Sequence, residues 1–466
     1  MIQAAALVRR RGGATPNQVL AIVCVGIILA NLDMFIVNVG LPSIGAEFHE
    51  ATLEDLSWIL NGYTIGFAAM LVFFGRLAER HRRDSSFIVG VGLFTVASAA
   101  CAASTSVAML VAFRIVQAAG AALMTPTSIG LLLATFPPEQ RGTAVRTWTA
   151  IGGFAAAFGP LAGGVLVALS WRWIFIVNVP IGLAAMAVAW RMLPAVPGHD
   201  AKPPNPLAAL LVTGGIATLT IAIIKVGDWG WHSPGILLCV AASALCLGLF
   251  VRHCRRSDNP FVDPSLFRIR PFTGAALTMA PYGIAFGAML FSIAMWEQTA
   301  WGWTALEAGL SIAPGPLLVP FTSLLVAGRL LRRVGPVPVL LGGIALFAAG
   351  LMIWALFVGT EPAPVAAVLG MVPIGIGVGL TWPTAMGLGT SSLPPSLFAT
   401  GSGVINMIRQ AALAIGVALF VAIIALPAPT PAASFHRGWW IMAAVIALGA
   451  VPTLLFMRPG PPRPAG

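Results

Sequence analysis

Residues 18–42 decide the fold, and they read QVLAIVCVGIILANLDMFIVNVGLP. Asp33 is the one side chain in this run that is charged at neutral pH. A helix that crosses the hydrocarbon core of a bilayer needs about 20 consecutive, mostly apolar residues. The run also lacks the strict alternation of apolar and polar residues that is typical of a barrel strand. It therefore predicts a transmembrane helix.

The rest of the chain has the same character. Of its 466 residues, 58% are hydrophobic and 9% are charged, and the mean hydropathy is +0.92. Soluble domains carry roughly 25% charged residues, so this chain cannot cover a water-exposed surface. Because backbone groups in lipid must be satisfied internally, we expect an all-α polytopic membrane protein.

Fourteen apolar segments are long enough to span a membrane. The loops and tails that remain are too short to form a soluble catalytic or ligand-binding domain. The predicted spans are 18–42, 56–77, 86–104, 107–134, 147–169, 173–192, 207–226, 234–252, 274–297, 305–327, 338–358, 364–388, 402–426 and 437–457.

The basic residues lie mostly in alternate loops. With the N-terminus placed inside, 21 of the 26 Lys and Arg residues fall in cytoplasmic segments and 3 fall outside. Cytoplasmic loops are enriched in Lys and Arg, so both termini are predicted to be cytoplasmic. The net charge of +11 then indicates orientation in the cytoplasmic membrane rather than a nucleic-acid-binding face.

Two short patterns recur in the second half of the chain. GRLAER at 75–80 returns as GRLLRRVG at 328–335, and FPPE at 136–139 returns as LPPS at 393–396. Repeated halves with a binding site between them are a transporter architecture. We expect a cytoplasmic N-terminal arm (1–17), an N-terminal six-helix half (18–192), a cytoplasmic linker (193–206), two inserted helices (207–252), a cytoplasmic loop (253–273), a C-terminal six-helix half (274–457) and a cytoplasmic tail (458–466).

Asp33 is the deepest acid in the predicted spans. A carboxylate near the bilayer centre costs about 3 kcal/mol on insertion scales, so it needs a partner, a cavity or a proton. Arg114 is the natural counter-charge, and Gln117 lies one turn along the same helix face. Either Asp33 and Arg114 couple proton binding to helix movement, or they form a purely structural buried pair.

Other polar side chains inside the spans have weaker assignments. Arg409 and Gln410 either mirror the Arg114–Gln117 group or place the guanidinium at the cytoplasmic interface. Glu297 and Glu307 flank an outer turn and are expected to be solvated. Candidates for a substrate cavity are Asn31, Asn38, Asn61, Tyr63 and Gln117.

Two further segments are candidates for conformational control. The loop after the second span combines four arginines with two acids, and it either latches one conformation or simply anchors the chain on the positive side. Its candidate gating residues are Gly75, Arg76, Glu79, Arg80 and Arg83. The fifth span holds a GxxxG pair that permits close helix packing and a proline that favours a kink, which are Gly159, Pro160, Gly163 and Gly164.

Motifs for other kinds of chemistry are missing from the sequence. There is no GxxxxGK[ST] loop and no CxxC pair, and the six histidines fall in loops or at span ends. We therefore expect no ATP hydrolysis, no metal centre and no cofactor.

These segments together resemble the major facilitator superfamily and, more narrowly, its fourteen-helix drug:proton antiporter branch. Residues 32–42, LDMFIVNVGLP, are similar to the first-helix motif L-D-x-T-I-V-N-V-A-L-P. Residues 75–83, GRLAERHRR, resemble the loop motif G-x-L-A-D-R-x-G-R, with Glu79 in place of Asp and Arg82 in place of Gly.

Three further segments carry the resemblance. Arg114 and Gln117, followed by Gly120, resemble the fourth-helix motif. Residues 159–164, GPLAGG, resemble the antiporter motif of the fifth helix. Residues 171–182, WRWIFIVNVPIG, are typical of the fourteen-helix branch.

The resemblance implies the major facilitator fold and proton-driven export of hydrophobic compounds. It implies that Asp33 and Arg114 couple protons, that the loop from Gly75 to Arg83 gates, and that the fifth-helix motif favours antiport. We expect an antiporter that acts as a monomer on neutral or monocationic drugs or antibiotics. The alternatives are an importer of a nutrient or siderophore and, less favoured, an integral-membrane enzyme.

Overall fold

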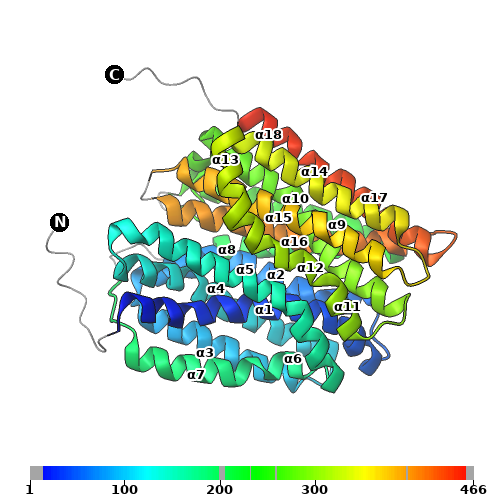
Figure 1. Ribbon diagram of the computed structural model, residues 1–466, viewed down its shortest axis with the longest axis horizontal. Coiled ribbons are helices and arrows are strands. Elements are labelled where there is room, and N and C mark those ends of the chain that lie inside the picture. The colour runs from blue at the N-terminus through cyan, green and yellow to red at the C-terminus, as the bar shows by residue number, and fades with distance from the viewer. Residues whose placement is uncertain (1–13, 199–204, 231, 258–259, 395–396, 458–466) are drawn as a thin grey trace.

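The computed structural model describes residues 14–198, 205–230, 232–257, 260–394 and 397–457. Within these ranges fourteen helical segments are long and apolar enough to cross a membrane, which confirms the predicted number. They pack side by side into one helical bundle (Figure 1). Most of the predicted arm, residues 199–204 of the linker, residues 258–259 of the following loop and the tail 458–466 lie outside the described residues.

The helices follow the apolar segments in order, and some crossings contain more than one helical element. The elements are α1 (Pro16–Glu47), α2 (Leu53–Arg80), α3 (Arg83–Ala102), α4 (Val107–Thr135), α5 (Pro138–Leu169), α6 (Trp173–Ile176), α7 (Asn178–Met192), α8 (Pro206–Trp229), α9 (Pro234–Arg256), η2 (Pro264–Arg268), α10 (Arg270–Thr299), α11 (Ala305–Ile312), α12 (Pro314–Phe321), η3 (Thr322–Ala327), α13 (Gly328–Val334), α14 (Pro336–Phe357), α15 (Pro364–Ser391), α16 (Phe398–Ala425), α17 (Pro431–Leu448) and α18 (Ala450–Phe456).

Local sequence explains where helices begin and where they are interrupted. The Thr15 hydroxyl accepts a hydrogen bond from the Gln18 amide at 3.4 Å, and the Gln18 side chain accepts one from the Thr15 amide at 2.8 Å. This capping box starts α1. In the predicted span 305–327, Pro314 and Pro320 lack the backbone donor that a regular helix uses, and the crossing is divided into α11, α12, the π-helical turn η3 and α13.

The start of α5 differs from its prediction. The helix begins at Pro138, well before the predicted boundary at 147. Its first turns carry polar and charged residues such as Glu139 and Arg141, which lower hydropathy without opposing helix formation. Hydropathy therefore located the membrane-crossing part of α5 and missed its extension.

The helices fall into two groups with matching internal contacts. In the first group α1 packs on α5 and α3 packs on α4, and in the second α10 packs on α16 and α14 packs on α15. Each group thus pairs its first crossing with its fifth and its third with its fourth. We call α1–α7 the N-terminal bundle and α10–α18 the C-terminal bundle (lower and upper in Figure 1).

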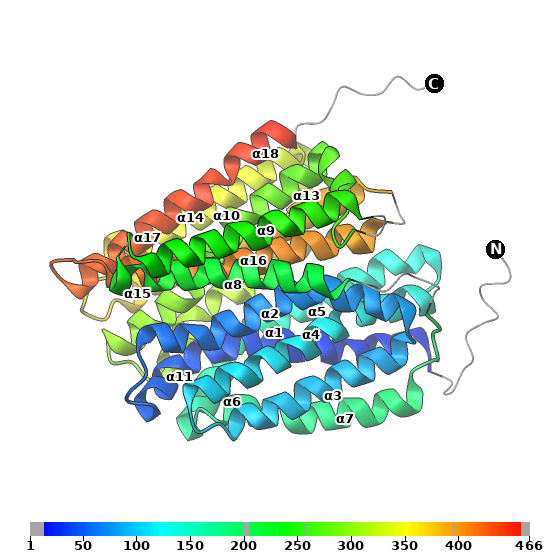
Figure 2. The same ribbon diagram turned by 180° about the vertical axis from the view of Figure 1, so that it is seen from behind.

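The inserted helices α8 and α9 pack on each other along one side of the molecule. Figure 2 shows α8 between α2 of the N-terminal bundle and α16 of the C-terminal bundle, and α8 contacts both. The helix α1 begins, and α18 ends, on the same side of the bundle (left in Figure 1). We call this side the terminal end and the opposite side the distal end.

Candidate functional site

A buried ion pair joins α1 and α4. The exposed fraction is 0% for Asp33 and 1% for Arg114, and Arg114 Nη1 donates to Asp33 Oδ2. Arg114 Nε also donates to the carbonyl oxygen of Ile59 on α2 at 3.2 Å. The pair expected from the sequence is therefore formed, and it connects three helices of the N-terminal bundle.

Gln117 completes the contact between the two charges. Its Nε2 donates to Asp33 Oδ1 at 2.8 Å, and its Oε1 accepts from Arg114 Nη1 at 2.7 Å. The amide therefore bridges the carboxylate and the guanidinium, as its position one turn from Arg114 allows.

Two further members of this network were missed by the sequence interpretation. Asn178, at the start of α7, donates through Nδ2 to Asp33 Oδ1 at 3.3 Å and to Ser98 Oγ at 3.0 Å. Ser98 on α3 also accepts from Gln117 Nε2 at 3.0 Å and donates to the carbonyl oxygen of Phe175 at 3.2 Å. Asn178 is the one side-chain amide in the apolar segment 173–192, and that isolation was the available signal.

The network meets the two requirements of a buried charge, which are an opposite charge and hydrogen bonds. The Asp33 carboxylate receives hydrogen bonds from Arg114, Gln117 and Asn178. The Tyr63 ring lies 4.1 Å from Arg114 Cζ, within cation–π distance. The Asp33–Arg114 pair therefore connects α1 and α4 and contacts α7 through Asp33 and α2 through Arg114.

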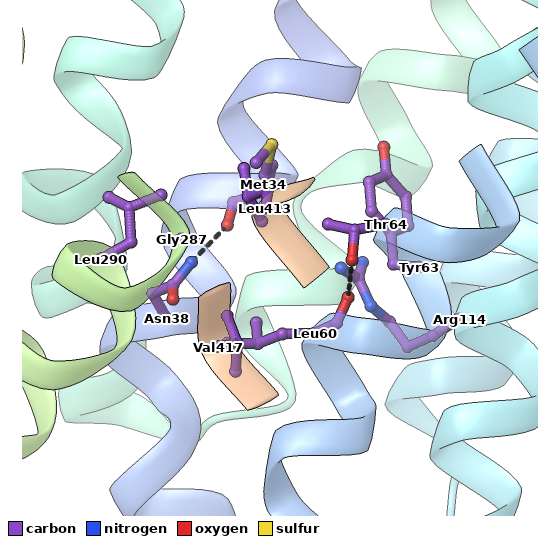
Figure 3. A pocket seen from close by; sticks show the side chains of 10 residues that line it. All are labelled: Met34, Asn38, Leu60, Tyr63, Thr64, Arg114, Gly287, Leu290, Leu413 and Val417. Atoms are coloured by element: carbon purple, nitrogen blue, oxygen red, sulfur yellow. Dashed lines mark hydrogen bonds between the residues drawn. The ribbon is translucent and has the colours of Figure 1, made fainter. Parts of the chain in front are cut away.

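Arg114 also faces the interface between the two bundles. A cavity of ≈ 10 Å³ lies beside it, large enough for about one water molecule. Its walls come from both bundles, as Figure 3 shows. They are Met34, Asn38, Leu60, Tyr63, Thr64 and Arg114 from the N-terminal bundle, and Gly287, Leu290, Leu413 and Val417 from the C-terminal bundle.

The candidate cavity residues are not all placed alike. Asn38 and Tyr63 line the small cavity at the interface. Asn31 instead donates to the carbonyl oxygen of Gly152 at 3.2 Å and braces α1 against α5. Asn61 is fully buried, and neither of its amide atoms has a hydrogen-bond partner among the described residues.

A larger cavity of ≈ 160 Å³ opens at the terminal end. Three of the candidate gating residues, Gly75, Arg76 and Arg83, line it together with residues of α4 and α16 such as Thr125 and Asn406. Arg83 Nη1 donates to the carbonyl oxygen of Gly130 on α4 at 2.9 Å, so the loop is fastened to the helix beside it.

Of the two acids in this loop, Asp84 is the one whose side-chain contacts lie within the described part of the structure. The side chain of Glu79 lies outside the described part of the structure, and Arg80 is exposed. Asp84 pairs with Arg82 at 2.6 Å and accepts from the Val196 amide at 3.3 Å. The Asp84 carboxylate raises the pKa of the Arg82 guanidinium. The loop is therefore connected to the linker through Asp84.

The fifth-helix motif lies where α5 meets its neighbours most closely. A methyl group at Gly163 would lie 3.2 Å from the carbonyl oxygen of Ile36 on α1, and one at Gly159 would overlap Phe35. A methyl group at Gly164 would lie 2.5 Å from the Cα atom of Leu306 on α11. The motif thus allows α5 to contact α1 on one side and the C-terminal bundle on the other.

The comparisons with known proteins agree with this arrangement. The family model of the Major Facilitator Superfamily matches residues 23–417. The chain belongs to this superfamily. It is therefore a multi-pass membrane transporter, and its fourteen crossings form the fold that the sequence predicted.

Curated relatives of this transporter are export and resistance proteins. The tetracenomycin C resistance and export protein of Streptomyces glaucescens is 31% identical over 88% of this chain and 75% of its own length. The cephamycin export protein of Amycolatopsis lactamdurans is 31% identical over 88% and 85%. The drug efflux pump JefA of Mycobacterium tuberculosis is 32% identical over 88% and 81%.

Solved structures show the same fold at low sequence identity. A peptide transporter of the POT family in complex with sulfate has a TM-score of 0.71 at 16% identity and covers 97% of both chains. The inward-open xylose transporter XylE from E. coli has a TM-score of 0.66 at 14% identity and covers 95% of this chain and 96% of its own.

The transporter has a second buried guanidinium, on α16. Arg409 is 8% exposed, so it does not reach the terminal end as one prediction allowed, and its Cζ lies 4.5 Å from the centre of the Trp382 ring. The other prediction, that Arg409 mirrors Arg114, also needs correction. The helix α16 is the fifth crossing of its bundle, whereas α4 is the fourth crossing of the N-terminal bundle.

The expectation that Glu297 is solvated is wrong. Its side chain is 0% exposed, and the Ser311 hydroxyl on α11 lies beside its carboxyl group without forming a hydrogen bond of normal geometry. The segment after α10 folds back over it, because the Trp303 amide donates to the Glu297 carbonyl oxygen at 3.1 Å and Trp301 Nε1 donates to Gly359 at 2.8 Å. Glu307 is exposed as expected and caps α11.

Proposed function

We propose that this transporter exports hydrophobic drugs or antibiotics in exchange for protons by alternating access. The observation that carries the proposal is the buried Asp33–Arg114 pair, because Arg114 both binds the carboxylate and lines the interface between the bundles. The export functions of three relatives, each about 30% identical, support the direction of transport.

In this proposal the terminal end faces the cytoplasm. The helix ends and connections at that end are rich in arginine, including Arg80 and Arg82 after the second crossing and Arg332 and Arg333 after the tenth, and cytoplasmic segments carry this excess. The protein would then reside in the cytoplasmic membrane. Hydrophobic substrates would enter from the cytoplasm through the ≈ 160 Å³ cavity at the terminal end.

The closed distal end supports alternating access. There α5 and α11 are packed so closely that a methyl group at Gly164 would lie 2.8 Å from the carbonyl oxygen of Ala305. Access is therefore asymmetric, with a cavity at one end of the interface and glycine-mediated contact at the other. Tilting the two bundles about the central region would exchange these two states.

A proton on Asp33 would change the forces at the interface. Neutralising one member of a buried ion pair costs about 3–5 kcal/mol because it leaves the other charge unpaired. A free energy of this size can invert a two-state equilibrium. Arg114 lies against the cavity that both bundles line, so the protonation state of Asp33 would alter the contact between them.

The test is drug-dependent proton movement in proteoliposomes that hold the purified transporter. A panel of hydrophobic antibiotics in an efflux-deficient host first identifies a substrate. Adding that substrate to the proteoliposomes should then release or take up protons, measured with a pH-sensitive dye. Asp33→Asn should abolish this proton movement, while Glu307→Gln, which removes an exposed acid, should not.

Two outcomes would refute the proposal. One is gradient-driven transport by Asp33→Asn at the wild-type rate. The other is substrate transport by the wild type that moves no protons. Transport should need no cofactor, and one chain per liposome should suffice because both bundles belong to the same chain.

A further inference from the structure

Arg409 is a buried cation with no acidic partner among the described residues. Among the described residues no carboxylate forms an ion pair with it, and its Nε atom is buried without an acceptor. Arg114, by contrast, has Asp33, Gln117 and the Ile59 carbonyl oxygen as partners. A buried charge without a partner is costly, so the site around Arg409 is incomplete as it stands.

Two polar groups in this region, one on the next residue of α16 and one on α10, are also unsatisfied among the described residues. Gln410 Oε1 and the Tyr282 hydroxyl are buried, and neither has a hydrogen-bond partner among the described residues. Tyr282 lies within electrostatic reach of the Arg409 charge. The helices α10 and α16 touch here, since a methyl group at Gly283 would lie 2.5 Å from the Arg409 carbonyl oxygen.

The position of this group links it to the translocation path. Gln410 is one helical turn from Asn406, which lines the cavity at the terminal end, and one turn from Leu413, which lines the cavity beside Arg114. Trp382, which stacks on Arg409, lines a third cavity of ≈ 40 Å³ together with Phe286. Arg409 itself follows Asn406 by three residues and precedes Leu413 by four, so it lies on α16 between the cavity at the terminal end and the cavity beside Arg114.

The charge along this path is positive. Arg76 and Arg83 line the cavity at the terminal end, and among the residues that the structure describes no Asp or Glu lines any of the three cavities. The Asp33 carboxylate already receives three hydrogen bonds. A cationic substrate would thus meet no available carboxylate in these cavities, whereas an anionic group would find a guanidinium and no competing acid.

We propose that Arg409, with Gln410 beside it, binds the acidic group of an amphipathic substrate, whose apolar body lies against Trp382 and Phe286. The planar guanidinium matches a carboxylate or phenolate oxygen. The preferred substrates are then hydrophobic acids, in place of the neutral or monocationic compounds expected from the sequence. This inference rests on the proposed export function, because it assigns the substrate class of the same transporter.

The test is equilibrium binding without a proton gradient, to purified protein in nanodiscs. The probes are 1-pyrenebutyrate, 1-pyrenebutanol and 1-pyrenebutylamine, which share a ring and a chain and differ in head-group charge. Binding is measured by energy transfer from tryptophan to pyrene, with empty nanodiscs subtracted. The wild type should bind the acid about tenfold or more tightly than the amine, since charged hydrogen bonds contribute about 1.5–3 kcal/mol.

Arg409→Gln should weaken binding of the acid about 10- to 100-fold and change binding of the alcohol by less than about twofold. Arg409→Lys, which keeps the charge but loses the planar fork, should be intermediate. Arg191→Gln removes an equal charge from the exposed end of α7 and should change neither affinity. Gln410→Leu should selectively weaken binding of the acid by a few-fold, and this variant is the test if Arg409→Gln does not fold.

Three results would overturn the inference. The first is an equal loss of affinity for the acid and the alcohol in Arg409→Gln or, where that variant does not fold, in Gln410→Leu. The second is wild-type binding of the amine that is as tight as binding of the acid. The third is the absence of saturable binding of the acid. Because no proton gradient is present, selective acid binding with no proton-coupled transport would refute the proposed function alone. Proton-coupled transport without acid selectivity would refute this inference alone.

Discussion

Replacing Gly164 by alanine should open the distal end of the interface. The added methyl group would lie 2.5 Å from Leu306 Cα and 2.8 Å from the carbonyl oxygen of Ala305. Ordinary van der Waals contact begins at 3.4 Å, so α5 and α11 must separate by about 0.9 Å. Both nearest atoms belong to the backbone, which cannot turn aside as a flexible side chain can.

The size of the effect follows from this overlap. Overpacking of a close interface costs about 1–3 kcal/mol, and this cost falls on the conformation in which α5 touches α11. The equilibrium between conformations open at the terminal end and at the distal end should therefore shift about 5- to 150-fold toward the distal-open one. Gly342→Ala is the matched control, since nothing lies within 4 Å of a methyl group there.

The assay is a distance measurement by double electron–electron resonance. Spin labels are attached at Leu169→Cys on α5 and Leu310→Cys on α11, which are both exposed, in a chain whose five native cysteines are replaced. Gly164→Ala should add a longer-distance population that Gly342→Ala lacks. Identical distance distributions for the two variants would refute the assignment of Gly164 to the distal closure.

Three other changes have expected outcomes. Asn178→Ala removes one of three donors to Asp33 and should lower thermal stability by about 1–2 kcal/mol; no loss would show that the 3.3 Å bond is dispensable. Glu297→Leu replaces a buried carboxyl group that has the Ser311 hydroxyl beside it but makes no hydrogen bond of normal geometry among the described residues; it should raise the midpoint of thermal unfolding, because a poorly satisfied polar group is removed. Glu307→Leu should lower the midpoint, because it removes one half of the capping box of α11. Asp84→Asn breaks the pair with Arg82 and should speed proteolysis of the linker after α7. Equal cleavage rates for the variant and the wild type would contradict the connection between Asp84 and the linker.

The membrane helices were predictable because their signal is local. Each is an apolar run of sufficient length, and charged residues inside such runs are rare enough to stand out. Asp33 and Arg114 were recognised for that reason, and their opposite charges predicted the pair that α1 and α4 form. Proline positions were equally visible, although the π-helical turn at Thr322–Ala327 could not be read from them.

The missed residues depended on tertiary packing. Ser98 resembles the other small hydroxyl residues of apolar helices, and the bundle alone brings it to Gln117 and Asn178. Glu297 stands at a predicted helix end, where hydropathy indicates solvent, but the chain around Trp301 and Trp303 folds over it. The predicted spans already placed Arg409 in the fifth crossing of its half, which α16 confirms, but they could not show that its guanidinium is buried against Trp382.

Because of the position of α8, the boundary between the N-terminal and C-terminal bundles is covered differently on the two sides of the transporter. The helix α8 packs on both α2 and α16 and is tied to α2 by the 2.5 Å Lys225–Glu54 pair, so it covers that boundary. Under the proposed alternating access, α8 would stay with α2 and slide on α16. On the opposite side α5 meets α12 directly, where the rings of Phe154 and Phe321 touch and Phe321 is half exposed. A compound dissolved in the bilayer would therefore meet two inserted helices on one flank and, on the other, the direct contact of α5 with α11 and α12.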